Sequence, residues 1–557
     1  MVGLENPIPM PRPTLSTFLR SAVCLAGAFL LGSCGDRLKS QADLVFINGA
    51  EVGSIDPSQV SAQVDGRVVT SLFEGLMRYN VQGRAEPGVS LEPTVSQDGL
   101  TYTFPFRADA KWSNGDTVTS QDFLFAWQRF LLPETAADYH NIFYCIKNAE
   151  AFNTGKLTDF SQVGVKAPDP KTLVVTLENP VPYFKDLVAF MAFCPIHVPT
   201  WKAKGAAYFK PGQLVGNGPY QLKEWRLNDR IRLERSPTYW DAANVKMASV
   251  DVLPIDNPST AVNLFLTDGS DLLMDKGLIP NALADELSKK NYFHHKPFLA
   301  TWFIRFNAKH PPYSDPRVRK ALTLVLDRER IVTAVTRLGE VPAFSITPPG
   351  TGDNYQPPAG LHPDIAEAKK LLAEAGFPDG RGFPVLNFLY PSKFPTDHGI
   401  AVELMNMWQK NLGITVALSS EEYKTYLDSQ KKEDYDVCRS SWVGDYNDPN
   451  TFLDMFLANS GNNRTGWASP AYDALITQAA KEADAAKRYG ILKQAETQLI
   501  ETECVVAPVY HYVGVQFYQP DFLGGVEANL IDEHPLRCMF WKQTPPRLQK
   551  AGAPSGR

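Results

Sequence analysis

The sequence lacks the motifs that many enzyme classes carry. Its 557 residues contain no HExxH motif, no GxSxG nucleophile elbow, no phosphate-binding P-loop and no GxGxxG after a strand. These absences argue against a metalloprotease, a serine hydrolase and a nucleotide-dependent enzyme. We therefore expect a protein that is not an enzyme and that needs no cofactor.

Cysteine is scarce and runs of like charge are missing. Only seven cysteines occur, and none stands in a CxxC spacing, which argues against a structural zinc site. The net charge of −6 comes from interspersed acidic and basic residues, whereas a nucleic-acid partner requires a concentrated basic face. We expect no metal and no nucleic acid.

The histidines do not suggest a metal site either. His294 and His295 are adjacent, so one metal cannot bind both from a regular strand or helix, and a solvated turn is expected there. His511 lies between Tyr510 and Tyr512, so in a strand the two tyrosines share one face and the histidine takes the other. This spacing predicts a structural histidine.

One loop invites a calcium interpretation. The segment 445–449 begins with Asp-Tyr-Asn, as an EF-hand loop can. The sixth position is Asn450 where glycine is required, and the twelfth is Phe456 where glutamate is required. Calcium is therefore set aside.

The start of the chain has the pattern of an export signal. Arg12 and Arg20 precede an apolar stretch, 22–31, that is too short to span a bilayer. Leu31-Gly32-Ser33-Cys34 resembles a bacterial lipobox, which predicts cleavage after residue 33 and lipidation of Cys34. A plain signal peptide, or a core cysteine, remains the alternative. We expect a protein in the periplasm or at the cell surface, anchored to a membrane only through a lipid.

Length and pattern predict several mixed α/β lobes. A chain of 557 residues exceeds the size of a single core. Residues 44–47 and 173–177 read as strands, and 364–375 reads as a helix that stops at Gly376. Another helix is expected to begin at Ser469-Pro470. The proline-rich tail after Trp541 is expected to be disordered.

A cation, an aromatic ring and an anion occur close together at Arg439, Trp442 and Asp445. Arg439 could simply hold a loop, and Asp445 could form an Asx turn or cap a helix near Thr451. A zwitterionic ligand gives the functional interpretation. Its ammonium needs a carboxylate and its carboxylate needs a guanidinium, because unpaired buried charge is costly.

From about Asp43 to Trp541 the chain resembles the oligopeptide-binding branch of extracellular solute-binding protein family 5. The likeness rests on many ordered segments: 54–57 (SIDP), 72–76 (LFEGL), 109–115 (DAKWSNG) with 122–123 (DF), 217–220 (NGPY), 235–240 (RSPTYW), 315–321 (DPRVRKA), 445–447 (DYN) and 508–510 (PVY).

The resemblance implies an α/β, two-lobed periplasmic-binding-protein fold of type II, cluster C, with an extra third lobe and hinges between the lobes. It places lobe I at 43–73, 198–297 and 513–545, lobe II at 74–197 and lobe III at 298–512. Residues 34–42 then form a tether, and 546–557 the disordered tail.

The implied function is capture of short peptides in an extended conformation and delivery to the permease of an ABC importer, by a monomeric protein. The same fold could instead bind a murein peptide, a metal chelate, haem or an opine-like conjugate. A lipid-tethered hydrolase or a surface receptor is the alternative from another class.

The resemblance also implies the site residues. Asp445 matches the carboxylate that receives the ligand's α-ammonium, and Arg439 a guanidinium that can reach its C-terminus. The remaining positions match pocket residues: Trp442, Tyr139, Tyr423, Tyr512 and Arg305. Arg305 stands where a relative has an acidic residue, which suggests a preference for acidic side chains in one pocket.

Cysteine positions differ from those of some relatives. Ala300 and Val443 stand where those relatives have a disulfide, and here both cysteines are absent together. Of the five cysteines after the leader, Cys145 and Cys194 fall in one implied lobe, so we expect this pair to be bonded if any is.

Overall fold

The computed structural model describes residues 42–60, 62–352 and 354–552. The predicted leader, the lipidation site Cys34 and most of the tether lie outside the described residues. Within these ranges, no helix combines the length and the apolar character needed to cross a bilayer.

One large mixed sheet runs through the molecule. Its strand order is β15 (Val416–Glu421), β14 (Leu386–Pro391), β16 (Val437–Val443), β12 (Phe293–Phe306), β17 (Val506–Tyr518), β11 (Leu272–Leu273), β1 (Leu44–Ile47), β10 (Ser249–Leu253), β9 (Arg230–Arg235) and β8 (Tyr220–Arg226), and β13 (Val341–Pro342) pairs with β17. The first strand, β1, thus pairs in parallel with β10 and β11 from much later in the chain.

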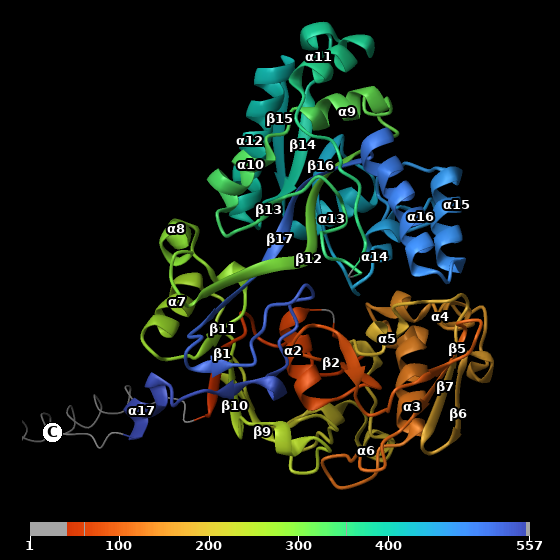
Figure 1. Cartoon of the computed structure of the whole chain (residues 1–557), viewed down its shortest axis with the longest axis vertical. Helices are drawn as coiled ribbons and strands as arrows, with labels where there is room; N and C mark the ends of the chain where they lie inside the picture. The colour runs from red at the N-terminus through yellow and green to blue at the C-terminus, as the bar shows by residue number, and fades with distance from the viewer. Residues whose placement is uncertain (1–41, 61, 353, 553–557) are drawn as a thin grey trace, which may run out of the picture.

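Strands β12 and β17 connect two bodies, which we call the upper and lower lobes after their positions in Figure 1. The two strands are antiparallel, and their register shifts between Pro297 and Thr301. Phe293 and Phe517 are buried in a core of the lower lobe, whereas Trp302 belongs to a core of the upper lobe. The irregular stretch begins at Pro297 between these cores and ends inside the upper lobe, where Leu299 belongs to a second core.

The upper lobe consists of β13 to β16 and the helices from α9 to α16 (Figure 1). Its helices are α9 (Pro316–Leu324), α10 (Arg328–Ile331), α11 (Ile365–Glu374), α12 (Pro395–Leu412), α13 (Tyr423–Lys431), α14 (Asn450–Leu453), α15 (Pro470–Lys481) and α16 (Ala485–Thr497). One core surrounds Trp408 and another surrounds Phe456, on either side of the strands.

The lower lobe combines the β1 half of the large sheet with a smaller unit beside it (Figure 1). The smaller unit has a sheet in the order β4 (Thr94–Val95), β5 (Thr101–Pro105), β7 (Thr172–Thr176) and β6 (Val165–Asp169), with α3 (Ser120–Leu131), α4 (Ala149–Asn153) and α5 (Phe184–Leu187). The remaining elements are α2 (Gln63–Leu72), α6 (Val198–Lys204), α7 (Pro258–Leu266), α8 (Ala284–Leu287), α17 (Pro546–Gly552) and the strand pairs β2 (Met77–Tyr79) with β3 (Ala85–Pro87) and β18 (Leu523–Gly524) with β19 (Phe540–Trp541).

Local signals in the sequence predicted several elements correctly. β1 spans the predicted strand 44–47, and β7 lies within one residue of the predicted 173–177. Helix α11 begins after Asp364, whose side chain accepts from the N–H of Glu367 at 2.9 Å, and it stops before Gly376 at φ +100°. Helix α15 begins at Pro470, with Ser469 as its cap.

The predicted disorder from residue 546 is wrong for the first part of the tail. Helix α17 spans Pro546–Gly552, and Arg547 is buried and pairs with Asp271 at 2.7 Å. The same guanidinium donates to the carbonyls of Ala42 and Asp43. A buried cation with these partners fixes the segment on the lower lobe, which composition alone could not indicate.

The expected disulfide between Cys145 and Cys194 is also wrong, since both cysteines are free. The Cys145 thiol donates to the carbonyl of Ile142 at 3.4 Å. Burial raises the pKa of both thiols, that of Cys145 to about 12, which suppresses the thiolate that disulfide exchange requires. Ala300 and Val443, which stand where some relatives have a disulfide, lie directly opposite each other in β12 and β16.

The turn expected at the paired histidines is not present, because both lie in β12. His294 stacks on Tyr518 with 4.1 Å between ring centres. The prediction for His511 is confirmed: it is buried with its Nδ1 2.9 Å from Thr301 Oγ1, on the face of β17 opposite Tyr510 and Tyr512.

Candidate ligand-binding cleft

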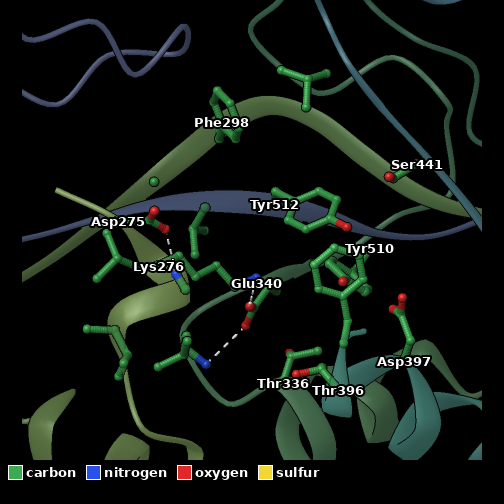
Figure 2. A pocket seen from close by; sticks show the side chains of 18 of the residues that line it. Asp275, Lys276, Phe298, Thr336, Glu340, Thr396, Asp397, Ser441, Tyr510 and Tyr512 are labelled. Carbon is green, nitrogen blue, oxygen red and sulfur yellow. Dashed lines mark hydrogen bonds and ion pairs between the residues drawn. The ribbon is translucent and has the colours of Figure 1, made fainter. Parts of the chain in front are cut away.

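A cavity of about 630 Å³ lies where β12 and β17 pass from one lobe to the other. Both lobes contribute to its wall, which includes 275–277, 394–397, Phe298, Glu340, Tyr423, Arg439, Ser441, Tyr510 and Tyr512. Figure 2 shows Lys276 and Glu340 to one side of Tyr510 and Tyr512, and Asp397 to the other. The volume is in the range of small-molecule sites.

A second cavity of about 330 Å³ adjoins the first. Gln63, Phe298 and Val443 line both of them. Because the two cavities share these side chains, they form one groove between the lobes, which we call the cleft. The smaller cavity is its acidic end, since Asp445 and Glu533 line it.

Backbone hydrogen bonds hold Asp445 at the acidic end of the cleft. It follows β16, whose last residue pairs with Ala300 of β12, and the N–H of Gly444 donates to the carbonyl of Leu299 at 2.7 Å. The N–H of Asp445 itself donates to Thr451 Oγ1 at 3.1 Å. The N–H of Asn450 at the start of α14 bonds to Asp448 instead of Asp445, so Asp445 is not the helix cap.

The carboxylate of Asp445 is half-buried and has no countercharge among the described residues. Burial is the one cause that raises its pKa, from 3.8 to about 6, and the described residues offer it no hydrogen bond or ion pair. Burial raises the pKa of Tyr139 to about 12 and that of Asp454 to about 7, and the charge of Asp445 adds to both shifts. Such a group is ready to receive a cation.

The loop after Asp445 is fixed by an internal ion pair. Asp448 and Arg488 are both buried and form two parallel bonds of 2.7 and 2.8 Å. Next to this pair, Tyr446 stacks on Tyr183 of the lower lobe, with 4.0 Å between ring centres and 5° between planes. The acidic end is therefore positioned by a contact between the lobes.

Arg439 is in the cleft but already has a partner. Its Nε lies 3.0 Å from Asp397 Oδ2, and Asp397 also accepts from Trp302 Nε1 at 2.9 Å. Arg439 Nη2 donates to the hydroxyl of Tyr512 at 3.3 Å. Burial opposes the charge of Arg439, yet Tyr512 and Asp397 keep its pKa above the usual value.

The sequence reasoning missed a second ion pair in the cleft, between Lys276 and Glu340. The Glu340 side chain is fully buried, whereas Lys276 retains 25% of its side-chain exposure. Lys276 Nζ lies 4.7 Å from the centre of the Tyr512 ring. Burial opposes the ionised form of Glu340, but Lys276 lowers its pKa overall. No motif marks these two residues, which come from separate segments.

Not every predicted site residue lies at the cleft. Tyr423 and Tyr512 line its larger cavity and Tyr139 its acidic end, whereas Trp442 and Arg305 line neither. Arg305 is buried and donates to Ser440 Oγ and to the carbonyls of residues 462 and 463. The expected role of Arg305 in selecting acidic side chains therefore has no basis in the structure.

Strand alternation explains this difference. Arg439, Ser441 and Val443 share the face of β16 that lines the cleft. Ser440 and Trp442 lie on the opposite face, where Arg305 bonds to Ser440 at 3.0 Å. The indole nitrogen of Trp442 is buried there without a partner among the described residues.

Two lobes joined by long crossing strands, with a charged cleft between them, define a solute-binding protein of the periplasmic-binding type. The model of the bacterial extracellular solute-binding proteins, family 5, matches residues 84–464. The chain belongs to this family, and the predicted fold class is confirmed.

Relatives match over almost the whole chain. The periplasmic oligopeptide-binding protein OppA of Escherichia coli is 37% identical over 93% of this chain and 96% of its own. The solved structure of the E. coli murein tripeptide binding protein MppA has a TM-score of 0.75 and 34% identity, covering 90% of this chain and 98% of its own. The solved structure of Haemophilus influenzae OppA in complex with RPPGFSPFR has a TM-score of 0.75 and 32% identity, covering 90% of this chain and 100% of its own.

Proposed function

We propose that this protein captures short peptides in the cleft and delivers them to the permease of an ABC importer. The observation that carries the proposal is Asp445, a half-buried ionisable carboxylate that lines the smaller cavity and has no cation of its own among the described residues. A peptide's α-ammonium supplies that cation. Relatives named for oligopeptide and murein peptide binding support a peptide as the ligand.

The rest of the cleft suits a peptide main chain. Tyr512, Tyr423 and Ser441 line the larger cavity, and their hydroxyls can donate to or accept from peptide groups. Arg439 and Lys276 are each paired internally, so a ligand carboxylate would be received as a third member of an existing ion pair. The lobes would then close over the peptide by bending where β12 and β17 pass from one lobe to the other.

The proposal extends to location and partners. Homologues are periplasmic or extracellular binding proteins. We propose in addition that lipidated Cys34 tethers the protein to a membrane, that it acts as a monomer and that it catalyses no reaction. Intact mass of the membrane-extracted protein tests the tether, because a cysteine-terminated mature chain carrying acyl groups is expected from residue 34 onward, and an unmodified chain would exclude it.

The function is tested by identifying the natural ligand. Protein purified without denaturation is extracted, and its small molecules are analysed by mass spectrometry. Calorimetry then compares unblocked tripeptides with N-acetylated copies, a murein tripeptide and deoxycholate. Micromolar or tighter binding of unblocked peptides, lost on acetylation, is expected. Equal binding of the acetylated copies, or binding of a solute without an amine, would exclude the proposal.

A further inference from the structure

The charges of the cleft do not balance. In its larger cavity, the two cations Lys276 and Arg439 are each paired with a carboxylate of the same wall. The acidic end contains Asp445 and Glu533, and no lysine, arginine or histidine is among its described lining residues. A single α-ammonium neutralises one of these two half-buried carboxylates and leaves the other without an ion-pair partner, which is unfavourable when it is ionised.

Glu533 has no ion-pair partner of its own among the described residues. Burial raises the pKa of Glu533 to about 7, and Arg67 and His534 lower it only in part. Arg67 donates to the backbone carbonyl and the side-chain oxygen of Asn48, at 3.3 Å each. His534 lies 3.0 Å from Asp532 Oδ1. His534 therefore bonds to another carboxylate and Arg67 to a neutral amide, and neither forms an ion pair with Glu533 among the described residues.

Asp445 and Glu533 act on the same space. Both line the 330 Å³ cavity, and the charges of both add to the burial that raises the pKa of Tyr79, which also lines it. At about 30 Å³ of liquid volume per water, the cavity has room for roughly ten heavy atoms, the size of one long residue. Its apolar wall, which includes Phe190 and Met191, suits a methylene stem.

We infer that Glu533 selects peptides whose first residue carries a cationic side chain, so that Asp445 binds the α-ammonium and Glu533 the side-chain cation of one residue. This inference rests on the proposed function, because it requires a peptide amino terminus at Asp445. It names lysine-like first residues as the preferred class of ligand.

The test compares three tripeptides by calorimetry on ligand-free full-length protein: Lys-Ala-Ala, norleucine-Ala-Ala and Ala-Lys-Ala. Norleucine keeps the stem of lysine and removes its charge. We expect Lys-Ala-Ala to bind at least about tenfold more tightly than the other two, as for a charged hydrogen bond in a buried site. In Glu533→Gln, Lys-Ala-Ala should fall to the level of norleucine-Ala-Ala.

Glu286→Gln is the matched control, because it removes one negative charge from a side chain that is 68% exposed and lies outside the cleft lining. Glu286→Gln should still bind Lys-Ala-Ala about tenfold more tightly than the other two tripeptides. Equal affinity for the three peptides, a ratio that survives Glu533→Gln, or preference for Ala-Lys-Ala would each overturn the inference while leaving peptide binding intact. Failure of every tripeptide to bind would overturn the proposed function as well.

Discussion

Replacing Asp445 with asparagine separates ligand binding from folding. Asparagine keeps the shape of the side chain and removes its charge, and the backbone bonds from Gly444 to Leu299 and from Asp445 to Thr451 do not depend on that charge. Raising the pKa of Asp445 from 3.8 to about 6 corresponds to about 3 kcal/mol against ionisation in the empty cleft. A bound ammonium removes this penalty and adds a charged hydrogen bond.

We therefore expect Asp445→Asn to weaken tripeptide binding by about 2–4 kcal/mol, or roughly 30- to 700-fold. The ligand-free variant should unfold at a temperature equal to or above that of the wild type at pH 7.5. The sign follows because a carboxyl whose pKa is raised on folding contributes stability at low pH that is lost as the pH rises through about 6.

Calorimetry measures the affinity, and thermal unfolding of stripped protein measures the stability. The combination of weaker binding with undiminished stability marks a ligand site. Affinity within about threefold of wild type, less than the energy of one charged hydrogen bond, would refute the assignment of Asp445. A lower unfolding temperature would show that Asp445 supports the fold instead.

Three further changes have expected outcomes. Tripeptide affinity should change little between about pH 7.5 and 6.5, where both the peptide α-ammonium and Asp445 are mostly charged, and fall towards tenfold per pH unit below about 6, because protonation removes the charge of Asp445; a flat profile from pH 7.5 to 4.5 by calorimetry would contradict this. Lys276→Met should lower the free energy of unfolding in urea by about 3–5 kcal/mol, because it leaves Glu340 buried and unpaired, and adding Glu340→Gln should recover most of it; an additive double variant would argue against the pair. Tyr183→Ala should weaken peptide binding by about 1–2 kcal/mol and expand the liganded protein in small-angle X-ray scattering, because the stack on Tyr446 that joins the lobes is lost, and unchanged values would exclude a role in closure.

The sequence indicated the residues of the site that lie close together along the chain. Arg439 and Asp445 belong to one strand and the loop that follows it, and the cleft contains both. Trp442 was assigned to the pocket from the same segment, although alternation along β16 turns it to the opposite face. Applying the two-residue period of a strand would have corrected this from sequence alone.

Other parts of the site could not be predicted. Lys276 and Glu340 become partners only because the segments before β12 and before β13 fold against β17. Glu533 reaches the cavity of Asp445 from the far end of the chain. No local pattern encodes these pairings, since they depend on how the lobes meet. Helix caps such as Asp364 and Ser469 were predictable because their partners lie three residues away.

The most direct measurement is a crystal structure of the protein with an unblocked tripeptide. We expect the peptide to lie in the cleft between the lobes, with its α-nitrogen within about 3.2 Å of a carboxylate oxygen of Asp445. A peptide bound with its amino terminus elsewhere, or with Asp445 facing solvent, would contradict it.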